Sequence, residues 1–425
     1  MNKKSPLNPF LSLLLLSMLL ATPYATVPVQ ATSSWNIQTI DEYACSSGYG
    51  TACPIAIDSK NITHIAYTAY TSVGHPWRAV YASWNGSTWN KQTLAEDSFV
   101  QCLALDANDN PHILYFDPPD HLEYASWTGT SWTVQNTGIQ GTSFALALDP
   151  SGSPHIAYTE GDVKYASISG KTWNSQTLDS GTELISLSIA VDSNNKPYIL
   201  YSPSSYADFN LTVGIRAVNV KVATYQNSSW NIQAVPLPPP TGDIGNIVVD
   251  SEGYPHFICT QHHYVSSEDK TVLSTILYAS WDGDAWETQV VVRDVVLQSL
   301  GQLVLDANDN PHFTYLTPAS DGKTKSFYTS WTGKAWDIQM AETEQGQTAC
   351  GSLALDANGN PHISCRGASR MRYTTTLLYA TATTVTQATS PTVSESLILT
   401  VVTIVVGIGL LVYFKKRKHL IDPRV

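Results

Sequence analysis

Apolar and polar residues alternate most clearly along Tyr124–Gln135, which reads Tyr-Ala-Ser-Trp, a tetrapeptide with a glycine, and Trp-Thr-Val-Gln. Two short alternating stretches joined by a turn signal predict a β-hairpin. The Trp-x-x-Gln part occurs seven times, and in six copies a residue eight positions upstream opens the partner strand. The seven copies begin at Trp35, Trp89, Trp132, Trp173, Trp230, Trp286 and Trp336.

A second pattern precedes the hairpins: Leu-x-Leu-Asp, a polar turn, and an apolar strand that usually begins Pro-His. Each unit therefore holds four strands, which we call A to D. Units recur every 43 to 58 residues, a spacing typical of propeller blades. The aspartates that end strand A are Asp58, Asp106, Asp149, Asp192, Asp250, Asp306 and Asp356.

The two ends of the repeat array are incomplete. The seventh unit has no Trp eight residues after Tyr379, and the first Trp-x-x-Gln, at Trp35, has no hairpin partner. Pairing Trp35 beside Tyr379 would close the ring and leave no open sheet edge at the seam. We therefore predict an all-β, seven-bladed β-propeller over residues 32–382, closed by its N-terminal strand.

The segments outside the repeats predict a surface protein with a single membrane span. Residues 1–31 resemble a signal peptide, with cleavage near Ala25 or Ala31. Residues 383–396 are rich in Thr and Ser and predict a stalk, and residues 397–414 are an uncharged run long enough for a transmembrane helix. The basic tail, residues 415–425, is then cytoplasmic and the propeller extracellular.

Charge and cysteine content narrow the ligand classes. Between the two ends, 16 Lys and Arg face 34 Asp and Glu, a formal charge of −18, which argues against nucleic-acid binding. No motif calls for a cofactor or a metal. Six cysteines in an exported chain permit disulfides but do not fix their pairing. Cys259 and Cys365 replace a repeated Tyr, so we expect them to be buried thiols.

Two segments carry a resemblance to known repeat families. Leu353–Ile363 resembles an NHL-type strand–turn–strand, and Ser280–Trp286 is similar to a shortened Asp box of sialidase-type (BNR) propellers. The resemblance implies the propeller fold. In sialidases three arginines grip the substrate carboxylate beside a Tyr–Glu pair and an Asp, but no motif fixes such roles to positions here.

Strand direction divides the propeller into two faces. The A–B and C–D turns, of constant length, share what we call the turn face; the B–C and D–A connectors, of variable length, share the loop face. Binding residues usually lie on variable loops. Loop-face candidates for ligand binding are Arg78, Arg216, Arg293, Arg366, Trp77, Tyr206 and His262. The alternatives are that the arginines neutralise acids such as Asp208 and Asp294, and that the aromatics fold long loops onto the ring.

Other polar motifs have structural interpretations. His64, His112, His155, His256, His312 and His362 recur from blade to blade, so we expect them to pair with polar groups of the turns. The Asp-Ala-Asn-Asp-Asn segments at Asp106 and Asp306 suit tight turns better than calcium. Glycosylation sequons begin at Asn61, Asn85 and Asn227 in turn-face turns and at Asn210 in the longest loop.

Three functions remain open. The first is a cell-surface recognition or adhesion propeller whose loop face binds an extracellular glycan or protein. The second is a sialidase-like glycoside hydrolase that uses loop-face arginines with Asp117, Glu160 or Asp294. The third is a structural envelope protein. Three arginines converging near the central channel would favour the enzyme, whereas a face lined by aromatics with dispersed charges would favour binding.

Overall fold

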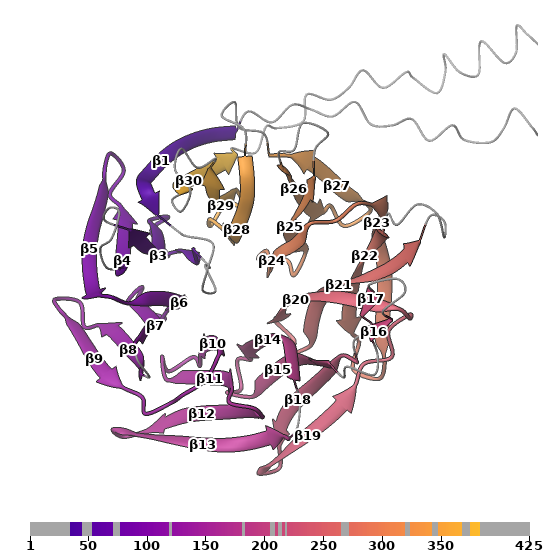
Figure 1. Cartoon of the computed structure of the whole chain (residues 1–425), viewed down its shortest axis with the longest axis horizontal. Coiled ribbons are helices and arrows are strands. Elements are labelled where there is room, and N and C mark those ends of the chain that lie inside the picture. Colours follow the sequence, from indigo (N-terminus) through magenta and orange to yellow (C-terminus); the bar gives the residue numbers. More distant parts are fainter. Residues whose placement is uncertain are drawn as a thin grey trace, which may run out of the picture. The chain divides into compact units, whose positions relative to one another are not determined.

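The computed structural model describes residues 35–44, 53–70, 77–118, 121–180, 183–204, 209–210, 215–216, 219–264, 272–318, 324–341, 347–367 and 375–382. These residues form strands and turns arranged as a ring of seven four-stranded antiparallel blades (Figure 1). In the first six blades the strands follow chain order, whereas in the seventh the outermost strand is β1; strand A lies nearest the centre of the ring and strand D outermost. The predicted seven-bladed, all-β propeller is confirmed.

The strands have the following bounds. Blade 1 holds β2 (Ile55–Ile57), β3 (Thr63–Tyr70), β4 (Trp77–Trp84) and β5 (Trp89–Glu96); blade 2 holds β6 (Phe99–Leu105), β7 (Pro111–Asp117), β8 (His121–Trp127) and β9 (Trp132–Asn136); blade 3 holds β10 (Ser143–Leu148), β11 (Pro154–Thr159), β12 (Val163–Ser169) and β13 (Thr172–Asp179). Blade 4 holds β14 (Glu183–Val191), β15 (Pro197–Ser204), β18 (Lys221–Gln226) and β19 (Ser229–Ala234), with a separate hairpin of β16 (Phe209–Asn210) and β17 (Ile215–Arg216). Blade 5 holds β20 (Thr241–Val249), β21 (Pro255–Tyr264), β22 (Val272–Trp281) and β23 (Trp286–Val295); blade 6 holds β24 (Ser299–Leu305), β25 (Pro311–Pro318), β26 (Thr324–Trp331) and β27 (Trp336–Met340); blade 7 holds β28 (Gln347–Leu355), β29 (Pro361–Gly367), β30 (Thr375–Ala382) and β1 (Trp35–Ala44).

The N-terminal strand closes the ring as predicted. β1 pairs with β30, with Trp35 opposite Ala382 and Gln38 opposite Tyr379. Its far end also pairs with β3 through Ala44 and Ala69, so blades 7 and 1 share one continuous sheet. The chain thereby covers the sheet edge that an open ring would expose.

The Asp that ends each strand A organises the A–B turn. Its Oδ1 accepts hydrogen bonds from the backbone N–H groups two and four residues further on, as Asp106 does from Asn108 at 2.8 Å and Asn110 at 2.8 Å. The residue three positions after the Asp has positive φ in every blade and is Asn, Asp or Gly, the residues that tolerate this conformation. Asp106 and Asp306 are thus both turn-capping residues.

Each repeated histidine is buried between the turn aspartate and a tyrosine, an arrangement that we call the Asp–His–Tyr relay. Histidine Nε2 lies 3.0–3.7 Å from the turn aspartate. Nδ1 bonds the hydroxyl of the strand-C Tyr, for example at 2.6 Å between His155 and Tyr165. The histidines lie beside the turn aspartates as expected, and His256 is within hydrogen-bond distance of its aspartate at 3.0 Å; the tyrosine partner is an addition. The six relays are Asp58–His64–Tyr81, Asp106–His112–Tyr124, Asp149–His155–Tyr165, Asp250–His256–Tyr278, Asp306–His312–Tyr328 and Asp356–His362–Tyr379.

The tryptophans of Trp-x-x-Gln join neighbouring blades. Each relay Tyr meets the strand-D Trp of the following blade edge to face, with ring centroids 4.9–5.9 Å apart. At two joints the Trp Nε1 also donates to the Gln of the preceding blade: Trp132 to Gln92 at 2.8 Å and Trp230 to Gln176 at 3.0 Å. Within one blade the Trp of the motif therefore contacts the preceding blade and, at these two joints, the Gln contacts the following one.

The cysteines follow the expectation where they are described. Cys259 is fully buried and Cys365 nearly so, both as thiols. Cys102 is also a thiol, and burial raises its pKa to about 12. Cys53, just before β2, is disulfide-bonded. Such bonds persist in oxidising compartments.

Within the described parts of the chain, no helix is long and apolar enough to cross a membrane. The predicted signal peptide, stalk, transmembrane helix and tail (1–31, 383–396, 397–414 and 415–425) lie outside the described residues.

Candidate functional site

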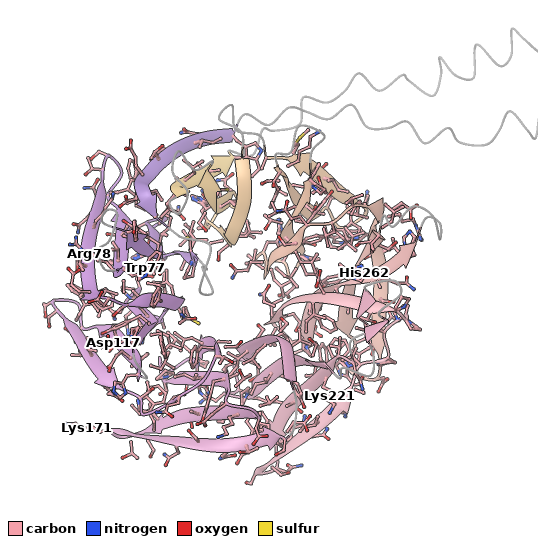
Figure 2. All side chains as sticks on the ribbon, in the orientation of Figure 1. Trp77, Arg78, Asp117, Lys171, Lys221 and His262 are labelled. Carbon is pink, nitrogen blue, oxygen red and sulfur yellow. The ribbon has the colours of Figure 1, made fainter. Side chains whose placement is uncertain are left out.

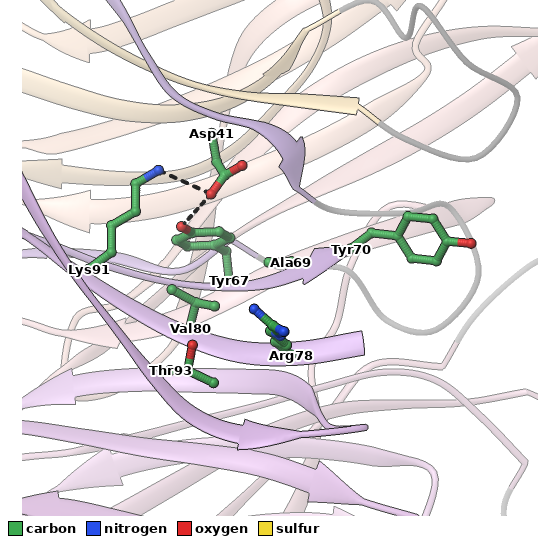
Figure 3. A pocket seen from close by; sticks show the side chains of 8 residues that line it. All are labelled: Asp41, Tyr67, Ala69, Tyr70, Arg78, Val80, Lys91 and Thr93. Carbon is green, nitrogen blue, oxygen red and sulfur yellow. Dashed lines mark hydrogen bonds and ion pairs between the residues drawn. The ribbon is translucent and has the colours of Figure 1, made fainter. Parts of the chain in front are cut away.

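A cavity of about 380 Å³ lies in the loop-face half of blade 1 (Figure 3). It forms where β1 leaves β30 to reach β3, with register shifts on both sides of Asp41. The shifted strand cannot pack flat against β3, and side chains of four strands surround the space. The lining residues are Asp41, Tyr67, Ala69, Tyr70, Arg78, Val80, Lys91 and Thr93.

Asp41 is the centre of a hydrogen-bonded cluster on one wall. Its Oδ2 accepts a hydrogen bond from the Tyr67 hydroxyl at 2.9 Å and another from Lys91 Nζ at 3.1 Å. Tyr67 is fully buried, and burial, with the nearby Asp41 charge, raises its pKa. The phenol therefore stays protonated and donates, which fixes the orientation of the carboxylate.

Arg78 forms the opposite wall with a carboxylate beside it. Its Nε donates to Glu96 Oε2 at 2.8 Å, and the two side chains are 40% and 55% exposed. An ion pair this exposed contributes little to stability. Figure 3 shows the Arg78 side chain among the lining residues, between Val80 and Tyr70. The pair orients donors at the cavity rather than holding the blade together.

Aromatic side chains border the same cavity. The Tyr70 ring, which lines it, lies 4.9 Å from that of Trp77, and Trp77 lies 5.5 Å from Phe99 at the start of blade 2. All three rings are partly exposed. Only Tyr70 of the three lines the cavity; Tyr70 and Trp77 are paired across β3 and β4, on the side of the sheet opposite to Tyr67 and Ala69. The aromatic rings therefore adjoin the cavity at the ends of these strands.

The chemistry of the lining suits an uncharged, polyhydroxylated ligand. Both cations already have a carboxylate partner, so the walls offer hydrogen-bond donors and acceptors without a net charge. Aromatic faces complement the C–H faces of a sugar ring, and the volume falls in the range of small-molecule sites. Among the described residues no cluster of three or more His, Cys, Asp or Glu could hold a metal ion.

The structure brings some of the predicted site residues together and separates others. Arg78 and Trp77 lie at the cavity and its rim, whereas His262 in β21 and Arg293 in β23 belong to blade 5. Figure 2 shows His262 on the far side of the ring from Arg78. His262 Nδ1 lies 3.0 Å from Ser274 Oγ, and burial lowers its pKa.

The remaining predicted ligand residues are only partly described. Arg216 lies in β17 and Arg366 in β29, but their side chains, like the whole of Tyr206, are outside the described set. Arg78 and Arg293, whose side chains are described, do not converge on one site.

The acids considered for a hydrolase also lie apart from one another. Glu160 accepts from Lys164 at 2.6 Å in blade 3, and Asp294 pairs with His263 at 2.7 Å in blade 5. Asp117 lies in blade 2, where Ser98 Oγ donates to it at 3.4 Å.

Three of the sequon asparagines have exposed side chains. Asn61 and Asn85 lie in turn-face turns, and their Oδ1 atoms accept backbone hydrogen bonds from Ala357 and from Ser87. Asn227 lies in the C–D turn of blade 4, and Asn210 lies in β16 with its side chain undescribed. Glycosylation at these positions stays a prediction.

The sequence did contain a signal for the cavity that we did not use. Asp41 follows Trp35 by six residues, and Asp179 follows Trp173 by the same interval. Asp179 builds a similar cluster between blades 3 and 4, accepting from Tyr201 at 2.9 Å and from Lys221 at 2.7 Å. The two tyrosines occupy the same strand-B position. The sequence therefore shows an Asp six residues after the Trp, together with a strand-B Tyr, at only two blade joints.

Comparisons with known proteins identify the fold. No family model matches the chain, and no curated protein matches it. Among solved structures it is similar to the polysaccharide lyase Uly1, with 11% identity over 83% of this chain and 99% of that one and a TM-score of 0.55. It is also similar to YCF48 bound to a D1 peptide, with 13% identity over 85% and 99% and a TM-score of 0.52. A lectin of Aleuria aurantia matches with a TM-score of 0.44, 12% identity and coverage of 70% and 96%.

Proposed function

We propose that this protein is a cell-surface recognition propeller that binds a saccharide in the blade 1 cavity without transforming it. The observation that carries the proposal is the cavity itself, in which two charge-compensated pairs face one space and which the partly exposed ring pair of Tyr70 and Trp77 adjoins at the strand ends. Similar propellers include a polysaccharide lyase and a peptide-bound protein, so the fold does not select the ligand class. The lining residues do, because they offer hydrogen bonds and ring faces rather than a net charge.

The surface location rests on two supports. The N-terminal apolar segment, the Thr/Ser-rich stalk and the apolar run at 397–414 followed by basic residues have the order of an exported, single-pass protein. The disulfide at Cys53 agrees with folding in an oxidising compartment. In this proposal the propeller is held outside the cell, where extracellular glycans are available to it.

A glycan array probed with the full-length protein in detergent tests the proposal. We expect binding to a restricted set of saccharides, and at least a tenfold loss of affinity on Arg78→Gln or Trp77→Ala. Lys171→Gln is the matched control, because Lys171 is an exposed cation in the C–D turn of blade 3, on the turn face. Binding that the cavity variants leave unchanged would refute the site, and binding to proteins or peptides alone would refute the ligand class.

A fluorogenic sialoside assay on the same preparation tests the hydrolase alternative. We expect no turnover, because Arg78 and Arg293 lie in different blades and each acid considered for catalysis has another local partner. Turnover that is lost on Glu160→Gln or Asp294→Asn would contradict a pure binding function.

A further inference from the structure

Five aromatic side chains, which we call the aromatic arc, follow one another along the loop face from blade 1 to blade 3. Tyr70 ends β3, Trp77 opens β4, Phe99 opens β6, Phe116 lies near the end of β7, and Phe144 lies near the start of β10. All of these positions are at the loop-face ends of their strands. Each of the five side chains is partly exposed.

The arc is continuous across two blade joints. Tyr70 and Trp77 have ring centroids 4.9 Å apart, and Trp77 and Phe99 are 5.5 Å apart. Phe99 and Phe116 are opposite each other in the β6–β7 register. The Phe116 and Phe144 rings then stack at 6.4 Å with an interplanar angle of 25°. The rings thus form one track instead of separate hydrophobic contacts.

The repeat does not require these rings. At the position of Phe116, one residue beyond the strand-B Tyr, the other blades carry Thr68, Thr159, Ser202, Thr260, Leu316 and Arg366. At the position of Trp77, four residues before the strand-C residue, the blade 2 and blade 3 equivalents are Asp120 and Gly161. A feature confined to three adjacent blades does not serve the ring in general. Phe144 also packs against the core between blades 2 and 3, but all five side chains keep part of their surface accessible to a ligand.

The track adjoins the proposed binding cavity across the ends of β3 and β4, because Tyr70, its first member, also borders the cavity while its ring points away from the other lining side chains (Figure 3). We propose that the site extends along the aromatic arc, so that the ligand is an extended neutral polysaccharide and not a single sugar. This inference rests on the proposed function and specifies its ligand class. Successive sugar rings would stack on successive aromatic rings while the chain end lies in the cavity.

Charge favours a neutral polymer over an acidic one. The part of the chain between the two ends carries a formal charge of −18, which repels an anionic polymer before contact. Near the arc, Glu96 and Asp117 add local negative charge, and Ser98 bonds both the Glu96 carbonyl at 2.8 Å and the Asp117 carboxylate at 3.4 Å. Hydroxyl groups can donate to such carboxylates, whereas uronate or sulfate groups cannot.

The dependence of affinity on ligand length tests this inference. Full-length protein in detergent would be titrated with manno- and chito-oligosaccharides from the monosaccharide to the hexasaccharide. We expect affinity to rise with length, by roughly tenfold or more over the series, because each added stacking contact is worth about a three- to tenfold gain. Affinity that is the same for the monosaccharide and the hexasaccharide would overturn the extended site and leave the cavity proposal intact.

Variants at the far end of the arc sharpen the test. Phe116→Leu and Phe144→Leu keep apolar packing but remove the flat ring, and each should lower hexasaccharide affinity roughly three- to tenfold while leaving monosaccharide binding unchanged. Tyr225→Leu, at a 37% exposed aromatic on the turn face, is the matched control and should change neither. Unchanged hexasaccharide binding in both Phe variants would overturn the inference. Failure of every saccharide to bind would overturn it together with the proposed function.

Discussion

Blade 4 and the other six blades reach the same architecture with different interiors. In the six, a buried histidine lies between an aspartate and a tyrosine and bonds the tyrosine, which meets a tryptophan of the next blade. Blade 4 has Tyr198 in place of the histidine and Val222 in place of the tyrosine. The Tyr198 hydroxyl instead donates to the Gly253 carbonyl in blade 5 at 2.8 Å.

The joint that follows blade 4 compensates with apolar contacts. Trp286, which has no tyrosine to meet, packs against Phe257 of its own blade at 5.2 Å. Val222, Leu200 and Phe257 belong to one buried cluster that spans blades 4 and 5. The relay and the apolar cluster are therefore two ways to fill the same space between blades. In blade 4 the histidine and the tyrosine positions are both changed, to Tyr198 and Val222. Removing only one partner would leave a buried polar group unpaired.

The comparison separates residues that stabilise the propeller from residues that occur in one place and are not required for the fold. Residues that recur in six blades stabilise blades and joints, and where they are lost an alternative contact replaces them. The cavity residues Asp41, Arg78 and Lys91 follow no such rule, since at the position of Asp41 the next two blades have Ala95 and Gly138. The cavity residues can therefore be replaced with little effect on the fold, and we expect their identity to depend on the ligand.

The largest expected effect comes from deleting a relay tyrosine. Tyr124→Ala should lower the free energy of unfolding by about 3–5 kcal/mol, because it empties a buried aromatic site and leaves His112 without its partner. Tyr225→Ala, at the exposed aromatic of blade 4, should lower the free energy of unfolding by clearly less. Denaturant titrations of both variants measure these free energies. Equal losses would show that the relay tyrosine contributes no more to stability than an exposed one.

Restoring the relay in blade 4 should have an intermediate effect. Val222→Tyr alone overpacks the apolar cluster, and Tyr198→His alone loses the bond to Gly253. Together they allow the histidine–phenol bond to form, so we expect a favourable coupling energy of about 0.5–3 kcal/mol in a double-mutant cycle. Additive losses would mean that the neighbouring blades cannot accommodate a relay at this position.

Acidification should lower the stability of the propeller through five of the relay histidines. Burial lowers the folded-state pKa of these five, against the opposing pull of the turn aspartates: His64, His112, His155, His312 and His362. The unfolded chain then binds more protons below its own pKa of about 6.5, so stability falls as pH drops through that value. Each histidine contributes at most about 1.4 kcal/mol per pH unit.

Calorimetric unfolding between pH 7 and pH 5 measures this slope. In the His112→Gln variant the number of protons taken up on unfolding, which sets this slope, should be smaller by up to one. This holds whatever the substitution does to stability at neutral pH. A Tm that does not fall on acidification would contradict the neutral, buried state of the relay histidines.

Much of the fold could be predicted because the repeat constrains it. Constant spacing from each Asp to the end of strand B, together with the unpaired Trp35, determined both blade number and closure. The relay could not be completed from sequence, because the contact between His112 and Tyr124 depends on cross-strand register and side-chain direction.

The candidate site was harder to predict for a similar reason. Arg78 and Trp77 were found by their loop-face positions. Asp41, in contrast, reaches the cavity only because β1 shifts register twice and crosses from blade 7 to blade 1. Such irregularities arise from packing at the seam, so the interval from Trp35 to Asp41, which recurs at Trp173 and Asp179, does not by itself indicate a cavity.

The most direct test of the account compares two aspartates that occupy equivalent positions and hold equivalent clusters. Asp41→Asn and Asp179→Asn each remove a carboxylate that is 22% exposed and bonded to a buried tyrosine and a lysine. Both should change the free energy of unfolding by about 1 kcal/mol or less. Titrated with the saccharide selected on the array, the Asp41 variant should lose at least tenfold in affinity and the Asp179 variant should match the unmodified protein. Equal affinities in both variants would contradict a binding site in blade 1.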